Sequence, residues 1–153
     1  MKKKKILIFT NSLWNITNFR ISLINKLLNS NHKVIIVGPL SEEKIFLEKL
    51  GCEVKKINID RKGMNPLIET FCFLKILLII FYSRPNLILS FTIKPNIYSS
   101  IASYFFSIPN IITITGLGSS LLRQNFKRKI VMVLINFSFK CTNIVFFQNN
   151  NDK

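Results

Sequence analysis

Polar and basic side chains gather at three places in the chain, each just after a short apolar run. The runs cover residues 6–9, 87–90 and 110–114. Hydroxyl and amide groups placed together orient the hydroxyl groups of a substrate, and cations with backbone N–H groups stabilise a departing phosphate. The candidate substrate-binding residues are Asn11, Ser12, Asn18, Arg20, Thr92, Lys94, Asn96, Thr115, Gly116, Gly118 and Ser119.

The last group contains a glycine turn, Gly116-Leu117-Gly118. Glycine lets the backbone approach a ligand closely. Ser119 or Ser120 can cap a following helix, whose first N–H groups can bind a phosphate. A strand-to-helix turn can also need glycine for its conformation alone, so the pattern does not by itself establish a ligand site.

Several other kinds of site lack their residues in this sequence. The turn after residues 6–9, TNSLWNITNFR, has no glycine, which disfavours a nicotinamide dinucleotide site, and no Walker loop is present. His32 is the single histidine, and Cys52, Cys72 and Cys141 lack paired spacing. We therefore predict no catalytic triad, no metal site, no disulfide framework and no cofactor, and no catalytic residue is assigned.

The candidate residues are held by strands that alternate with helices. We expect the segment after residues 6–9, Asn11–Asn18, to be a loop, with Thr17 or Asn18 capping the first helix. The apolar runs predict strands at residues 6–9, 34–37, 54–59, 87–90, 110–114 and 144–147. Further helices are predicted after Ser41, at residues 66–82, after Pro95 and at residues 121–139.

This alternation predicts an α/β fold: a doubly wound, mostly parallel sheet of about six strands with helices on both faces. The expected strand order is 3-2-1-4-5-6, with its switch point between the first and fourth strands. The loops at residues 11–20 and 92–96 should then face each other, with Asn18 and Lys94 on opposite sides of one cleft. We treat residues 1–153 as a single domain.

The chain carries 22 Lys and Arg against 7 Asp and Glu, a net charge of +15. This charge suits phosphates, anionic lipids or nucleic acid, although an A+T-rich genome also raises lysine content. Nucleic acid is disfavoured because no RNA-recognition, helix-turn-helix or zinc pattern is present. The segment at residues 71–82, FCFLKILLIIFY, is apolar almost all round. Such a helix is either covered by protein or in contact with a membrane.

Four segments occur together in the order TNSLWNITNFR, DRKGMNP, FTIKPNIYSS and ITGLGSS. In this combination the chain resembles the N-terminal domain of bacterial family-4 glycosyltransferases of the GT-B fold. The nearest branch adds sugars to lipid-linked or capsular glycans of the cell envelope. The ending VFFQNNNDK resembles the point where such enzymes leave this Rossmann-like, acceptor-side domain. Relatives often carry a histidine near the end of the fourth strand, where this chain has Thr92 and Lys94.

The resemblance implies a retaining transfer from a nucleotide-sugar donor to a lipid-linked glycan acceptor. It also implies a cytoplasmic protein, peripheral at the inner face of the membrane if residues 71–82 touch anionic lipid. The C-terminal donor-binding domain of the family is absent from the sequence, so we expect a truncated or split form that is inactive alone. The alternative is a non-catalytic partner subunit that docks onto a separate donor-binding domain, and whether the chain is an enzyme stays open.

Overall fold

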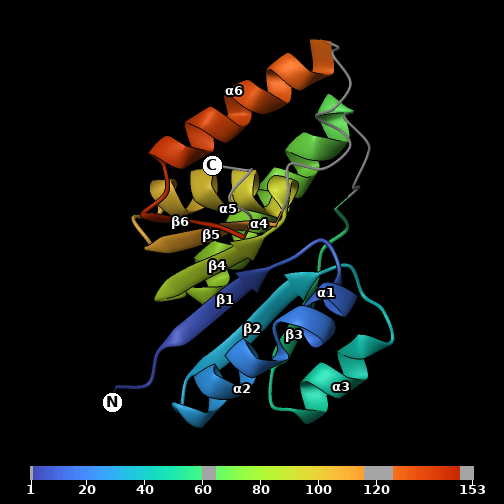
Figure 1. Ribbon diagram of the computed structural model, residues 1–153, viewed down its shortest axis with the longest axis vertical. Helices are drawn as coiled ribbons and strands as arrows, with labels where there is room; N and C mark the ends of the chain where they lie inside the picture. The colour runs from blue at the N-terminus through green and yellow to red at the C-terminus, as the bar shows by residue number, and fades with distance from the viewer. Residues whose placement is uncertain (1, 60–64, 116–125, 149–153) are drawn as a thin grey trace.

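The computed structural model describes residues 2–59, 65–115 and 126–148. Strands and helices alternate along this part of the chain (Figure 1). The strands are β1 (Lys5–Phe9), β2 (Lys33–Gly38), β3 (Glu53–Lys56), β4 (Leu87–Phe91), β5 (Asn110–Ile114) and β6 (Ile144–Phe147). The helices are α1 (Leu13–Phe19), α2 (Ile21–Asn29), α3 (Glu43–Lys49), α4 (Pro66–Ser83), α5 (Ile93–Phe105) and α6 (Phe126–Lys140).

The six strands form one sheet in the order β3-β2-β1-β4-β5-β6. Every pairing is parallel; β1, for example, pairs Ile8 with Ile36 of β2 and with Leu89 of β4. The central strands are apolar on both faces, as strands must be when helices cover both sides of a sheet. The predicted doubly wound fold and strand order are confirmed.

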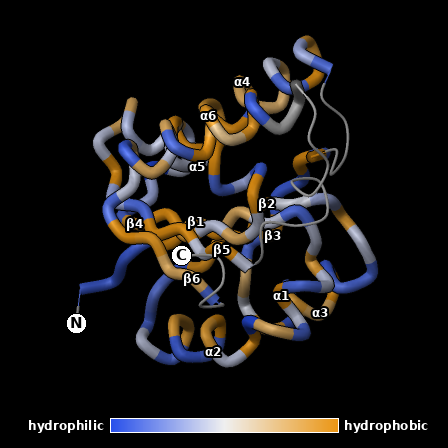
Figure 2. Tube along the Cα trace, turned by 45° about the horizontal axis from the view of Figure 1, so that its top comes forward, coloured by the Kyte–Doolittle hydropathy of each residue, from blue (hydrophilic) through white to orange (hydrophobic). Residues whose placement is uncertain are grey.

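The helices divide into two layers, with α1, α2 and α3 on one side of the sheet and α4, α5 and α6 on the other (Figure 2). The first layer packs on a core that includes Ile8, Ile36 and Leu47. The second packs on a core that includes Leu7 and Ile76. Burial of these side chains is the main favourable term in the stability of such a domain.

The segment after β1 differs from the prediction. The loop expected at Asn11–Asn18 is wrong, because Leu13–Phe19 is helix α1. Ser12, in extended conformation, is the N-cap residue of α1. The helix predicted to follow the loop is α2, whose N-cap residue is Arg20, so the cap predicted at Thr17 or Asn18 is wrong too. Leu13 and Ile16, three residues apart, are fully buried, and this burial holds the first turns of the helix against the sheet.

Other boundaries shift by a few residues. Strand β3 ends at Lys56 and not at residue 59, although the N–H of Ile57 still donates to the carbonyl of Gly38. Helix α6 is described from Phe126, and the start predicted at residue 121 lies outside the described residues. Helix α4 begins where predicted, with Pro66 in its first turn and the Asn65 side chain accepting from the N–H of Leu67.

Candidate functional site

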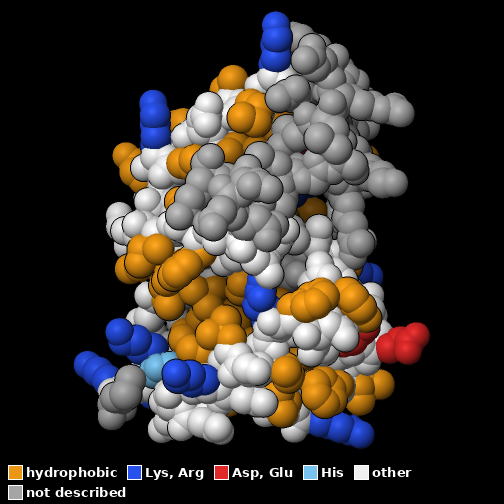
Figure 3. Space-filling model, viewed as in Figure 1, with side chains coloured by type: hydrophobic (Ala, Val, Ile, Leu, Met, Phe, Trp, Pro, Cys, Tyr) orange, Lys and Arg blue, Asp and Glu red, His pale blue; other side chains and the backbone are white. Residues whose placement is uncertain are grey.

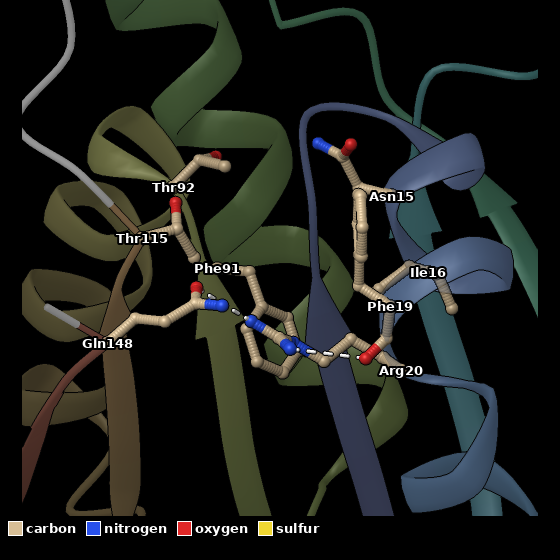
Figure 4. A pocket seen from close by; sticks show the side chains of 8 residues that line it. All are labelled: Asn15, Ile16, Phe19, Arg20, Phe91, Thr92, Thr115 and Gln148. Atoms are coloured by element: carbon tan, nitrogen blue, oxygen red, sulfur yellow. Dashed lines mark hydrogen bonds between the residues drawn. The ribbon is translucent and has the colours of Figure 1, made fainter.

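A cavity of about 300 Å³ lies at the carboxyl edge of the sheet, between the segment after β1 and the ends of β4, β5 and β6 (Figure 4). This edge is where parallel sheets bind ligands, at the point where the strand order reverses. We call this cavity the crevice. It is lined by Asn15, Ile16, Phe19, Arg20, Phe91, Thr92, Thr115 and Gln148.

Arg20 reaches across the crevice from the junction of α1 and α2. One guanidinium nitrogen donates to the carbonyl of Phe19 at 3.1 Å and another to Oε1 of Gln148 at 3.4 Å. The guanidinium carbon lies 4.9 Å from the centroid of the Phe91 ring, a cation–π contact (Figure 4). A guanidinium has five N–H donors in a planar fork, so this one keeps donors for a phosphate or carboxylate.

Thr92 stands at the crevice wall in a strained conformation. Its φ of 76° and ψ of 155° fall in a region that is essentially reserved for glycine. It is the N-cap residue of α5, yet its side chain caps no N–H of that helix. Its buried Oγ1 has no hydrogen-bond partner among the described residues. Strain and an unpaired polar atom at one residue are typical of a functional position.

We expect Thr92→Gly to raise the free energy of unfolding by about 1 kcal/mol, because glycine adopts this conformation without the strain of about 1–3 kcal/mol. The gain is reduced by the greater freedom of glycine in the unfolded chain. Urea denaturation measures the change. Thr92→Ala is the matched control: it removes the hydroxyl but keeps the strain, and equal stabilisation by both variants would refute the backbone explanation.

Lys94 does not line the crevice. Its Nζ lies 2.5 Å from Oε1 of Glu69 on α4, and the hydroxyl of Tyr98 donates to the other oxygen of the same carboxylate. Burial and then the hydrogen bond to the Glu69 carboxylate raise the pKa of Tyr98 well above its usual value. Lys94 therefore ties the start of α5 to α4, and we call Glu69, Lys94 and Tyr98 the α4–α5 clasp.

Asn96 and Asn18 hold local structure. Asn96 is buried, and its Nδ2 donates to the carbonyl of Thr113 at 2.9 Å, which joins α5 to β5. The Nδ2 of Asn18 donates to the carbonyl of Trp14 within α1 at 2.9 Å. Neither residue is among those that line the crevice.

The remaining candidate residues are also found partly inside and partly outside the crevice lining. Asn11 and Ser12 lie in the turn between β1 and α1, where the Thr10 hydroxyl donates to the carbonyl of Ser12, and they too are outside the crevice lining. The structure brings three predicted residues together in the crevice: Arg20, Thr92 and Thr115. Gly116, Gly118 and Ser119 lie outside the described residues.

Five lining residues were not predicted from the sequence: Asn15, Ile16, Phe19, Phe91 and Gln148. Gln148 directly follows β6, so the rule that selected residues after the other strands would have found it. Asn15 and Phe19 are four residues apart and share a helix face. This spacing carries no information when the segment is predicted to be a loop. Phe91 carries no polar group, and no pattern in the sequence marks it.

The cysteines are unsuited to nucleophilic chemistry. Burial raises the pKa of Cys52 to about 11, and burial is also the main cause of the raised pKa of Cys72. A protonated thiol is a poor nucleophile and a poor metal ligand. Within the part of the chain that the structure describes, no three His, Cys, Asp or Glu side chains gather as a metal site.

Comparison with known proteins connects this geometry to a family. The model of the "Glycosyl transferase 4-like" family matches residues 5–149. A curated relative, the N,N'-diacetylbacillosaminyl-diphospho-undecaprenol alpha-1,3-N-acetylgalactosaminyltransferase of Campylobacter jejuni, is 27% identical over 126 residues. The match covers 82% of this chain and 34% of the relative, so the chain spans about a third of that enzyme's length.

Solved structures share the fold. A glycosyltransferase from Rickettsia africae aligns with a TM-score of 0.64 at 18% identity, over 79% of this chain and 33% of that one. MurG of Acinetobacter baumannii aligns with a TM-score of 0.69 at 12% identity, over 98% and 42%. The UDP-GlcNAc 2-epimerase of Methanocaldococcus jannaschii aligns with a TM-score of 0.58 at 16% identity, over 97% and 40%.

A glycosyltransferase and an epimerase share this architecture, so the likeness to solved structures shows the fold and not the reaction. The family match covers nearly the whole chain and carries the assignment. The chain belongs to the glycosyl transferase 4-like family, and its six-stranded parallel sheet is the Rossmann-like half of a GT-B fold.

Proposed function

We propose that the chain is the acceptor-binding half of a glycosyltransferase and that the crevice takes a glycan acceptor linked to a lipid through a diphosphate. The donor is a nucleotide-sugar held mainly by a second domain or subunit. The observation that carries the proposal is Arg20, a cation that reaches across a cavity at the switch point of a family member. The acceptor class follows the name of the Campylobacter relative, whose substrate is diphospho-undecaprenol-linked.

The lining suits a molecule with a charged and a hydroxyl-rich part. The Arg20 fork can donate two parallel hydrogen bonds to one phosphate. Asn15, Thr115 and Gln148 supply amide and hydroxyl groups that orient sugar hydroxyls, and Phe91 supplies an apolar wall beside them. Holding the acceptor hydroxyl in a fixed direction contributes to rate by proximity, which is the role we assign to these residues.

The proton of the attacking hydroxyl needs a base from elsewhere. None of the eight described lining residues is a carboxylate or a histidine. The proton must therefore pass to a group outside these eight residues, such as a residue of the donor-binding half or a donor phosphate oxygen. The chain's own contribution is to bind, orient and exclude water.

The proposal is tested by titrating the chain with two ligands. Trp14 is the single tryptophan, and its ring meets that of Phe19, a crevice residue, edge-on at 5.5 Å, so its fluorescence reports on the crevice. A short-chain polyprenyl-diphosphate N-acetylhexosamine should change the Trp14 emission saturably, whereas UDP-N-acetylhexosamine should not at the same concentrations. Binding of the UDP-sugar alone would assign the crevice to the donor and overturn the proposal.

We further propose that the protein works at an anionic membrane surface, through the outer side of α4. Helix α4 has the length and apolarity of a membrane-crossing helix, but Cys72, Ile76 and Ile80 are buried on one side against the sheet. The other side exposes Phe71, with 65% of its surface accessible, together with Leu74, Leu78, Phe81 and Tyr82. The exposed Lys75 and Arg84 add positive charge to this side. Apolar side chains beside cations are typical of helices that lie in the headgroup region.

The chain should bind vesicles that contain anionic lipid and dissociate as salt rises from about 0.1 M to 1 M, because the Debye length falls from about 10 Å to 3 Å. Phe71→Ser should weaken this binding. Phe46→Ser should not, because Phe46 is an exposed phenylalanine of α3, which lies on the other side of the sheet from α4. Cosedimentation measures both. Equal binding to neutral vesicles would remove the electrostatic part of this proposal, and equal loss of binding in the two variants would remove α4 as the contact.

A further inference from the structure

The backbone of Arg20 is fixed by the two helices that meet at this residue. Its N–H donates to the carbonyl of Ile16 in α1 at 2.9 Å, and its carbonyl accepts from the N–H of Ile24 in α2 at 3.0 Å. The side chain is only half-buried, and an arginine side chain has many rotamers available in solvent. A fixed backbone alone therefore does not give the guanidinium fork one direction.

The contacts of the guanidinium differ in what they fix. Phe91, buried at the end of β4, supports the cation with its ring, but a cation–π contact does not set the direction of the N–H groups. The carbonyl of Phe19 accepts from one nitrogen, and a single hydrogen bond still allows rotation about itself. Gln148 supplies the second acceptor, Oε1, for the other nitrogen, and Figure 4 shows the two side chains pointing toward each other. Two acceptors on two nitrogens fix the plane of the fork.

Gln148 is anchored to the sheet. It directly follows β6, and its N–H donates to the carbonyl of Ile114, the last residue of β5, at 3.0 Å. The parallel pairing of β5 with β6 holds this position relative to the other strands of the crevice. The Gln148 side chain is exposed, so its substitution removes the contact with Arg20 without opening the core.

An amide at this position holds Arg20 without cancelling its charge. A guanidinium has no acceptor, so the amide oxygen takes the bond, whereas a carboxylate there would occupy the fork as an ion pair. The described acidic residues belong to α3, the residue before it, β3 and α4, and those visible in Figure 3 lie near α3. The four ion pairs among the described residues all involve lysine. The charge of Arg20 is therefore available to an anion.

We propose that Gln148 is a positioning residue, which sets the direction of the Arg20 fork so that the fork meets a diphosphate. The diphosphate as ligand rests on the proposed function, whereas the contact between the two side chains does not. Gln148 acts through Arg20, and two properties are required of it: an acceptor that reaches the guanidinium and the absence of negative charge.

Calorimetric titration with inorganic pyrophosphate, at near-physiological salt, tests the proposal. Gln148→Met removes the acceptor at similar size and should weaken binding about three- to tenfold, the effect of one net hydrogen bond. Gln148→Glu keeps an acceptor but cancels the charge, and it should weaken binding by about tenfold or more. Added to Arg20→Ala, Gln148→Met should change the affinity less than about twofold, because no fork is left to position. Lys26→Ala, an exposed cation of α2, is the control and should stay within about twofold as well.

Nitrogen-15 NMR of the chain without ligand gives a second readout. The Arg20 guanidinium should rotate about its Nε–Cζ bond faster in Gln148→Met than in the unaltered chain. Equal rotation rates would overturn the proposal. It would also be overturned if the unaltered chain did not bind pyrophosphate, if Gln148→Met weakened binding equally with and without Arg20, or if Gln148→Glu bound as well as the unaltered chain. The polyprenyl-diphosphate sugar does not enter these measurements, so a failure of the proposed function would show separately.

Discussion

No sugar transfer is expected from the 153-residue chain alone, whatever nucleotide-sugar and lipid-linked acceptor are offered. The eight described crevice residues include one cation and no acid, which is enough to orient an acceptor but not to hold and activate a donor. Correct placement of two reactants contributes on the order of 7–11 kcal/mol to enzymatic rates in favourable cases. The eight described residues place only the acceptor, so they do not supply that contribution, and an open crevice also admits water.

The measurement is product formation from a radiolabelled nucleotide-sugar, with a family donor-binding half present or omitted. Product that forms only when the second half is added would support a split enzyme. A chain that never gives product but still increases the activity of a separate, complete enzyme would support the partner-subunit alternative. Steady turnover by the chain alone would contradict the expectation.

Glu69→Ala should lower the free energy of unfolding by about 2–3 kcal/mol. In the clasp the carboxylate of Glu69 forms an ion pair with Lys94 and accepts a hydrogen bond from the hydroxyl of Tyr98. The side chains of Glu69 and Lys94 are only 21% and 20% accessible. Removing one member of a buried ion pair costs about 3–5 kcal/mol, because the remaining charge stays desolvated. The remaining exposure of this pair to solvent reduces that cost.

Urea denaturation of three variants checks the clasp. Glu69→Gln keeps a hydrogen-bond acceptor for Tyr98 and should lose less stability than Glu69→Ala. Glu48→Ala is the matched control, since Glu48 pairs with Lys44 at 3.7 Å on the exposed surface of α3 and should change stability by about 0.3 kcal/mol. The stabilising role of the clasp would be refuted if Glu69→Ala and Glu48→Ala lowered the free energy of unfolding equally.

The fold could be predicted because its signals are local. Each strand is an apolar run, and a parallel sheet buried on both faces needs such runs. Gly51, with a φ of +106°, ends the helix before β3, as its conformational freedom allows. The order of the strands then follows from the handedness of the crossovers and the switch point common to such folds.

The crevice could be predicted only in part, because its contacts join residues far apart in the chain. Arg20 bonds to Gln148, 128 residues away, and no spacing rule connects them. Lys94 has the position of a crevice residue, but an acid 25 residues earlier, on α4, holds its side chain. The two buried residues of α1, Leu13 and Ile16, are too few to show a helical period, so the sequence does not predict this helix or the place of Asn15 and Phe19 on it.

The central claim is that the crevice binds the diphosphate of a glycan acceptor through Arg20. The most direct test is the Trp14 titration with the polyprenyl-diphosphate sugar, repeated on Arg20→Ala and on Lys26→Ala, a cation exposed on α2. Hydrogen bonds to a charged group contribute about 1.5–3 kcal/mol, so Arg20→Ala should weaken binding roughly 10- to 100-fold. Lys26→Ala should change it less than threefold. Equal affinities for Arg20→Ala and the unaltered chain would contradict the account.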